Sequence, residues 1–457
     1  MPQMMTYSGH TRAVLRLGLP LVGGHVAQVL VGVTDTVMLG WYSVDALAAV
    51  TLGGTFFFTL MIFGAGFAWA VMPLVASFAA ENDETGLRRA TRMGLWLSLG
   101  FAVLALPLMY WSEPVLRLMG QSNQVAADAG LYLRVAGFGI FPALIVMVLK
   151  SYLAALERTQ VVFWITVAGA VVNGLANYAL IFGNWGAPEL GITGAAIASV
   201  VSQMAYLLLT VIYVRRSLPQ HALFQRLWRA DPQMLKRVFS LGWPIGLTSL
   251  SETGLFAASA LMMGWIGTVA LAAHGIAVQL AAVTFMVHLG LSNAATIRAG
   301  NALGRRDPVH MERGGITVTV LSLITSALTI AVFVTFPEPL LNLFMQEDEP
   351  QRVAILSIGV GLLGMAALFQ LVDGAQAIAL GLLRGVQDTR APMIYAAVSY
   401  WGLGIPCSYA FGFWFGLGGI GIWLGLVIGL GMAAILLSWR FWLVALREVR
   451  AGVTVAG

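Results

Sequence analysis

Charged side chains are scarce in this chain of 457 residues. Asp, Glu, Lys and Arg together make up 10% of it, and 59% of the residues are hydrophobic. A soluble globular domain carries about 25% charged residues, so this chain has too few to cover a surface that faces water. Mean hydropathy is +0.85. The scarcity of charge excludes a soluble domain and makes lipid the solvent for most of the surface.

Cysteine and the common catalytic motifs are missing as well. Cys407 is the only cysteine, so no disulfide can form within the chain. There is no Gly-x-x-x-x-Gly-Lys-Ser/Thr motif of a P-loop ATPase, no His-Glu-x-x-His motif or cysteine cluster for zinc, and no Gly-x-Ser-x-Gly motif of a serine hydrolase. We therefore expect no enzyme and no cofactor. If the chain transports a solute, an ion gradient must supply the energy.

What the chain has instead is a series of apolar runs of membrane-spanning length. Twelve such runs recur, six in each half: 13–40, 46–72, 94–112, 130–153, 161–183, 192–214, 240–263, 270–295, 315–336, 354–383, 392–415 and 419–445. They predict an all-α integral membrane protein with an N-lobe over 1–214, a cytoplasmic linker over 215–239 and a C-lobe over 240–457. Apolar residues among the basic ones of 218–239 predict a helix on the membrane surface.

The net charge of +5 reflects membrane topology. The connections after the odd-numbered spans carry only Arg117 and Arg352, whereas most of the 25 Lys and Arg residues lie at the termini and in the other connections. The positive-inside rule then places both termini in the cytoplasm. We expect no nucleic-acid partner.

Arginine greatly outnumbers lysine, and Ala, Gly and Val are abundant, which suggests a GC-rich bacterial genome and thus the inner (plasma) membrane of a bacterium. Nothing in the sequence points to an oligomer, and we expect a monomer.

The two halves of the chain repeat each other. Three pairs of matching segments are separated by 224 positions: 17–20 with 241–244, 38–41 with 262–265, and 46–49 with 270–273. Further along, the separation has grown by a few residues, and 190–194 matches 417–421. A duplicated hydrophobic chain is the signature of a secondary transporter, in which substrate and ion sites lie near the membrane midplane and access alternates by rocking of the two halves.

Three acidic residues fall inside the predicted spans: Asp35, Glu252 and Asp373. Each costs roughly 2.5–3.5 kcal/mol at a helix centre on insertion scales, so such residues are functional by default. Asp35 also lies near the outer end of its span, and an interfacial position is the alternative for it.

Polar residues accompany each acid. Gln28 precedes Asp35 by seven residues on the same helix face, Thr248 and Ser259 share the face of Glu252, and Gln370 and Gln376 flank Asp373 at three residues on either side. Asn173 and Asn177 lie on one face of the fifth span. They could line a site, or they could bridge two helices.

Other polar residues in the spans are better explained by structure. We expect His274 and His288 to be satisfied core histidines. Lys150 is expected to extend toward the cytoplasmic interface.

With these residues in view, the chain resembles the MATE (multidrug and toxic compound extrusion) family, and most closely its NorM branch. The resemblance covers essentially the whole chain. It rests on 33–40 (Val-Thr-Asp-Thr-Val-Met-Leu-Gly), 46–50, 173–178 (Asn-Gly-Leu-Ala-Asn-Tyr), 191–199, 382–385 (Leu-Leu-Arg-Gly) and Asp388-Thr389.

The resemblance implies a V-shaped pair of six-helix lobes that exports amphipathic cationic drugs or dyes in exchange for Na⁺ or H⁺. It also implies an N-lobe ion site of Asp35, Asn173 and Asn177, with Ser199 as a weaker member because relatives often have Thr there. Glu252 and Asp373 would form a C-lobe cation site, able to hold Na⁺. Phe369 and Gln370 lie beside it, and Phe369 stands where some relatives have Tyr, which weakens a direct sodium site and leaves proton coupling open.

Two other functions are compatible with a polytopic protein. Flippases of lipid-linked precursors share the wider superfamily, but their anionic substrates favour basic rather than acidic spans. A membrane-embedded sensor or scaffold would leave the three buried acids unexplained.

Overall fold

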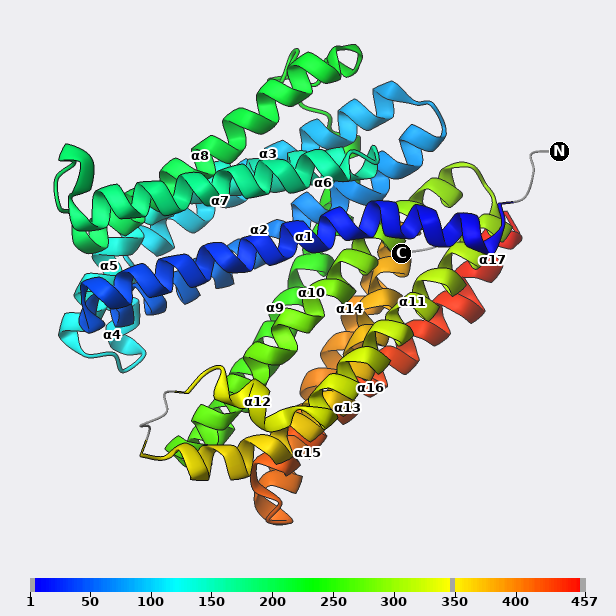
Figure 1. Cartoon of the computed structure of the whole chain (residues 1–457). Coiled ribbons are helices and arrows are strands. Elements are labelled where there is room, and N and C mark those ends of the chain that lie inside the picture. The colour runs from blue at the N-terminus through cyan, green and yellow to red at the C-terminus, as the bar shows by residue number, and fades with distance from the viewer. Residues whose placement is uncertain (1–4, 346–349, 453–457) are drawn as a thin grey trace. The chain divides into compact units, whose positions relative to one another are not determined.

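The computed structural model describes residues 5–345 and 350–452, and within these ranges it contains helices and no strand (Figure 1). The described chain divides into two compact units. We call residues Gly23–Gly246 the N-unit, and Leu247–Gly457 together with Met1–Val22, in their described parts, the C-unit. Helices α1 (Tyr7–Tyr42) and α9 (Pro232–Ile266) each contribute to both units. The lobe boundaries expected from the sequence stay a prediction.

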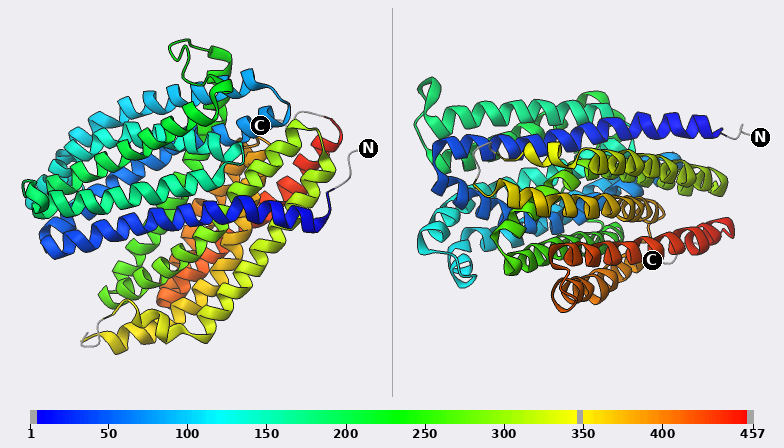
Figure 2. Two further views of the ribbon diagram at one scale, coloured as in Figure 1. Left: turned by 45° about the horizontal axis from the view of Figure 1, so that its top comes forward. Right: turned by 60° about the horizontal axis from the view of Figure 1, so that its bottom comes forward.

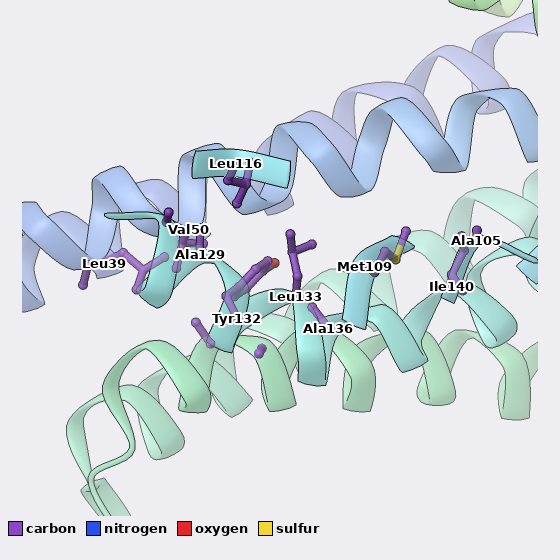
Figure 3. Close-up of a cluster of buried hydrophobic side chains, with 14 of the residues drawn as sticks. Leu39, Val50, Ala105, Met109, Leu116, Ala129, Tyr132, Leu133, Ala136 and Ile140 are labelled. Atoms are coloured by element: carbon purple, nitrogen blue, oxygen red, sulfur yellow. The ribbon is translucent and has the colours of Figure 1, made fainter. Parts of the chain in front are cut away.

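The N-unit is built around one interrupted helix. This helix consists of α5 (Asn123–Ala136), the short η1 (Gly137–Gly139) and α6 (Ile140–Ala155). It packs against α2 (Val44–Ala80), α3 (Glu84–Tyr110) and α8 (Gly191–Ser217), and α8 in turn lies beside α7 (Thr159–Phe182), as the views in Figure 2 show. Small and branched apolar residues fill the space between these helices, and Figure 3 shows them around Tyr132, Leu133 and Met109.

The C-unit repeats this arrangement. Its central helix is α13 (Arg352–Gly385), which packs against α10 (Thr268–Gly304), α11 (Pro308–Thr335) and α16 (Gly418–Trp439). The helices match in length as well: 36 and 35 residues for α1 and α9, 37 each for α2 and α10, and 27 and 28 for α3 and α11. The short helices α4 (Ser112–Leu118) and α12 (Pro337–Asn342) also correspond. The duplication seen in the sequence is therefore a duplication of structure.

Eleven helices of the described residues are long and apolar enough to cross a membrane. The twelfth expected span, 392–415, is also helical but irregular. Here α14 (Arg390–Ala397), π-helical η4 (Val398–Gly404), α15 (Ile405–Tyr409) and π-helical η5 (Ala410–Trp414) follow one another without a break. A further π-helical stretch, η6 (Arg440–Ala445), leads from α16 into α17 (Leu446–Arg450). Wide π turns are rare and often occur at functional sites.

Repeated glycines show why the two halves share local geometry. Gly191 and Gly418 have φ values of +51° and +56°, which only glycine adopts at little cost. Three residues later, a Cβ on Gly194 would lie 2.2 Å from the carbonyl oxygen of Leu180, and one on Gly421 would lie 2.5 Å from the backbone of Phe411. In both repeats, glycine thus lets a helix contact the backbone of the helix before it.

The helix caps repeat too. Asp83 accepts a hydrogen bond from the backbone amide of Gly86 (2.8 Å), and Asp307 accepts one from that of His310 (2.9 Å). Both aspartates therefore cap helices, as their aligned positions predict.

The surface helix expected over 218–239 is wrong for 218–231, whereas 232–239 form the first turns of α9. Only a 3-10 turn, η3 (Pro219–His221), and isolated turns precede α9, and Ala222 and Arg226 have positive φ. Side chains of α3 hold this segment: Arg92 donates to the carbonyls of Leu223 (2.8 Å) and Ala222 (2.7 Å). These tertiary bonds and the prolines that bracket the segment override its amphipathic composition.

The end of the linker is fixed by Asp231. It accepts hydrogen bonds from the Arg89 guanidinium and from the backbone amide of Met234 (3.1 Å), which caps α9. The hydrogen bond from Arg89 holds the pKa of Asp231 below its usual range. The linker is thereby attached to α3 by charge as well as by backbone contacts.

Packing at Gly194 predicts a sharp effect of one methyl group. Gly194→Ala should lower the free energy of unfolding by about 1–3 kcal/mol, because the added Cβ forces α7 and α8 apart. The measurement is thermal unfolding of the detergent-purified protein. Gly100→Ala on an exposed face of α3, where no atom lies within 4 Å, is the matched control and should be neutral or stabilising. Equal stability of both variants would contradict the close approach.

Candidate functional site

Asp35 forms the centre of a polar cluster in the N-unit. Its Oδ1 accepts a hydrogen bond from Asn177 Nδ2 (2.5 Å), and the same amide donates to Oδ1 of Asn173 (3.2 Å). Both asparagines are 1% exposed, whereas Asp35 is half-buried. The Oδ1 of Asn177 has no hydrogen-bond partner among the described residues. The structure thus brings Asp35 to two asparagines that follow it by 138 and 142 positions in the sequence.

Close contact between α1 and α7 makes this meeting possible. A Cβ on Gly23 would lie 2.8 Å from the ring of Phe163, so the first turns of the N-unit part of α1 pack tightly on α7. Further along, Gly174 is within ordinary contact of Thr34. Asp35 follows Thr34 directly, and its side chain therefore reaches the asparagine face of α7.

Two tyrosines near Asp35 escaped the sequence analysis. Tyr132 on α5 interacts electrostatically with Asp35, and its hydroxyl is within hydrogen-bonding reach of Ser199. Ser199 donates its own proton to the carbonyl of Ala195 (3.0 Å), so its oxygen can accept the hydrogen bond from Tyr132. Tyr206 on α8 also interacts with Asp35, and its hydroxyl has no hydrogen-bond partner in the part of the chain described. Both tyrosines look like ordinary aromatic core residues in the sequence.

A second cluster lies in the C-unit. The amide of Gln376 donates to Oε1 of Glu252 (3.3 Å), joining α13 to α9. Asp373, one turn earlier on α13, is 3% exposed and interacts electrostatically with Glu252. Two oxygens here, Asp373 Oδ1 and Gln376 Oε1, have no hydrogen-bond partner within the described ranges. The structure therefore brings close together the two acids that the resemblance pairs.

Of the residues that flank Asp373, Gln376 belongs to the site, whereas Gln370 and Phe369 pack against other helices. Gln370 turns away, because its amide donates to the carbonyl of Ala281 on α10 (3.2 Å). Phe369 is 1% exposed and packs between Phe256 of α9 (ring centroids 5.9 Å apart) and Trp423 of α16 (5.6 Å). It forms an aromatic wall one turn from Asp373.

Two residues beside Glu252 were not predicted as site residues. Arg384, three turns after Asp373 on α13, interacts electrostatically with Glu252. Tyr400 of η4 interacts with both Glu252 and Asp373. In the sequence, Arg384 is one of the basic residues of the connections that set the membrane topology. Only its spacing of eleven residues from Asp373, which is three helical turns, indicates that the two residues share a helix face.

His274, His288 and Lys150, which the sequence explains by structure, have structural partners. His274 accepts from the indole of Trp423 (3.1 Å), and His288 pairs with Ser322 (2.9 Å), as expected for core histidines. Lys150 lies over the ring of Tyr206, with its Nζ 4.9 Å from the centroid. This cation–π contact, worth about 0.5–2 kcal/mol, is what accommodates the lysine in α6.

Both clusters are chemically suited to a monovalent cation or a proton. They offer carboxylate, amide and hydroxyl oxygens, which are the ligands hard cations prefer. Among the described residues, no group of three or more His, Cys, Asp or Glu side chains could hold a metal ion.

Apolar spanning helices, a structural repeat and buried acids in each half define a multi-pass membrane transporter. The chain belongs to the MatE family, whose model matches residues 20–179 and 244–410, once in each repeat.

Named relatives resemble the chain over nearly its whole length. A protein of Rhizobium meliloti named probable multidrug resistance protein NorM is 45% identical over 97% of this chain and 95% of its own. Its namesake from Agrobacterium fabrum is 41% identical, over 97% of this chain and 96% of its own.

Solved structures share the fold. A MOP superfamily transporter from Pyrococcus furiosus superimposes with a TM-score of 0.86 over 96% of this chain and 97% of its own, at 21% identity. A MATE structure in the bent conformation gives 0.87 over 97% of both chains, at 20% identity.

The bond between Asp35 and Asn177 can be measured by a double-mutant cycle. Asp35→Asn and Asn177→Leu should show a coupling energy of about 0.5–3 kcal/mol in thermal unfolding, because the two side chains are in direct contact. The same cycle between Asn177→Leu and Asp45→Asn, an exposed acid in the first turn of α2, is the control and should be additive within about 0.5 kcal/mol. Additivity in both cycles would contradict the contact.

Proposed function

We propose that this protein is a multidrug efflux antiporter that exports amphipathic organic cations in exchange for Na⁺ or H⁺. The observation that carries the proposal is the pair of acid clusters, each holding buried oxygens that have no hydrogen-bond partner in the described part of the chain. Carboxylates in membrane spans are costly and are retained where they handle ions or charged substrates. The names of the relatives supply the drug-resistance part of the proposal.

The acids provide a means of coupling. In surroundings of low polarity, an ionised carboxylate needs a neutralising partner. A proton, a sodium ion or the positive charge of a drug can each serve, and only one can do so at a time. Ion entry would then displace the drug, and alternating access would turn this competition into export.

Aromatic side chains near the acids suit a lipophilic cation. Phe369, Phe256 and Trp423 form a connected group beside Asp373 and Glu252. Ring faces attract organic cations, and the carboxylates add charge selection. We place the protein in a bacterial inner membrane with both termini cytoplasmic, acting as a monomer, on the basis of its arginine distribution and composition.

Substitution of the C-unit acids tests the proposal in cells. Glu252→Gln and Asp373→Asn should each reduce drug resistance to the level of cells without the protein, at normal expression, because the neutral amide no longer exchanges a cation. The measurement is the minimal inhibitory concentration of ethidium and a fluoroquinolone. Glu338→Gln, an exposed acid on the short α12, is the matched control and should keep full resistance. Resistance retained in both site variants would remove the C-unit cluster from the mechanism.

Efflux from proteoliposomes separates the coupling ions. Ethidium efflux should run under an inward sodium gradient or an inward proton gradient, each imposed alone, and Asp35→Asn should abolish it if the N-unit cluster carries the ion. Efflux under sodium alone would assign Glu252 and Asp373 as sodium ligands. Efflux under the pH gradient alone would make the acids proton carriers. No efflux under either gradient would contradict the antiporter.

A flippase of anionic lipid-linked precursors is the second candidate. The observation that favours it is the presence of two basic residues among the spans, Lys150 over Tyr206 and Arg384 beside Glu252. Loss of a flippase would alter the cell wall in unchallenged cells, whereas loss of a drug exporter should be silent until a drug is added.

A further inference from the structure

Tyr400 occupies an unusual environment for a tyrosine. It is fully buried, and its hydroxyl makes no hydrogen bond of ordinary length to any described residue; only the side chain of Gln376 lies within reach of a longer one. A buried polar group left without a partner costs about 1–3 kcal/mol. The phenol interacts electrostatically with Glu252, Asp373 and Arg384. A hydroxyl of this kind is expected where a ligand completes its bonding.

Close packing brings the helix that carries Tyr400 to the acids. A Cβ on Gly254, two residues after Glu252, would lie 2.6 Å from the indole ring of Trp401. Tyr400 precedes Trp401, so α9 and η4 are in direct contact at the level of the C-unit cluster. The backbone here is π-helical, which changes the direction of side chains relative to an α-helix and is common at functional sites.

Three oxygens of this cluster make no hydrogen bond of ordinary length to any described residue: Tyr400 OH, Asp373 Oδ1 and Gln376 Oε1. They come from two different helices, and Glu252 on α9 supplies a third side of the cluster. Each is an oxygen of a type that binds a hard cation. When both acids are ionised they repel each other, and a monovalent cation bound at the cluster would relieve this repulsion.

The repeat supports the same assignment. In the N-unit, α7 brings Asn173 to Asp35. The offset between repeats is 230 residues at Glu157 and Gln387, which share positive φ, and 227 at Gly191 and Gly418. The counterpart of Asn173 therefore falls within 400–403, in the turn that begins with Tyr400. Corresponding helices thus bring an uncharged polar residue to the acid of each unit.

We propose that the hydroxyl of Tyr400 is a ligand of a monovalent cation bound by Glu252, Asp373 and Gln376. It supplies the phenolic oxygen that Phe369, one turn before Asp373, does not have. This assignment deepens the antiporter function proposed above and rests on it for the role of the bound ion.

Equilibrium binding of ²²Na⁺ to the purified protein at pH 8 tests the assignment. Tyr400→Phe removes one oxygen and keeps the ring, and it should weaken Na⁺ binding about tenfold or more. Tyr409→Phe, on the exposed side of the same irregular helix, is the matched control and should bind as the wild type does. Tyr400→Met, which fills the space with a flexible apolar side chain, should weaken binding as Tyr400→Phe does and provides a second variant if the first folds poorly.

Thermal unfolding without Na⁺ separates a ligand from a structural residue. Because the hydroxyl makes no hydrogen bond of ordinary length to any described residue, Tyr400→Phe should unfold at about the wild-type temperature or above it, and the stabilisation that Na⁺ confers should decrease. A variant that is less stable in the absence of Na⁺ but binds Na⁺ normally would overturn the assignment. Unchanged affinity in both Tyr400 variants would do the same.

Failure of the Tyr400 assignment can be distinguished from failure of the proposed drug export. A wild-type protein that exports ethidium under a pH gradient but binds no Na⁺ overturns the role of Tyr400 and leaves drug export in place. A wild-type protein that binds Na⁺ through Tyr400 but exports no drug supports the ligand assignment and overturns the antiporter.

Discussion

The structure depends on one constraint, which is that a carboxylate inside a membrane-spanning helix must find polar partners within the protein. Asp35 finds the amide of Asn177, and Glu252 finds the amide of Gln376. Each bond joins two helices and so determines which faces must meet. In the N-unit, glycine contacts between α1 and α7, at Gly23 and Gly174, bring the backbones close enough for the short side chain of Asp35 to reach Asn177.

The repeat shows how one scaffold can carry two different sites. Gln28 and Asp35 on α1 correspond, at an offset of 224, to Glu252 and Ser259 on α9. The acid is the second polar residue in one repeat and the first in the other. Seven residues of helix are about 10 Å, so the two acids stand at different levels of their helices. The scaffold is thus conserved between the halves while the position of the charge is not.

Much of the fold could be predicted because helix periodicity and membrane thickness are local constraints. The spans, the repeat and the caps at Asp83 and Asp307 follow from residue order. The linker could not be predicted, because Arg92 of α3 binds carbonyls 130 residues away and overrides an amphipathic pattern. At the site, Asp373 flanked by Gln370 and Gln376 leaves the choice between them open, since i−3 and i+3 are equally close on a helix. Packing chose Gln376 for Glu252 and bonded Gln370 to α10.

The sequence by itself determined that this chain is a duplicated helical membrane protein with three acids in its spans. Those facts depend on composition, period and offset, which a linear chain displays. Only the tertiary structure decided which polar groups meet. It brought Tyr132 to Asp35 and Tyr400 to Glu252 and Asp373, although neither tyrosine differs in sequence from a core aromatic. The physical reason is that hydrogen bonds and ion binding act over a few ångströms in space, and the side chains concerned lie on different helices, separated in the sequence by up to 148 residues.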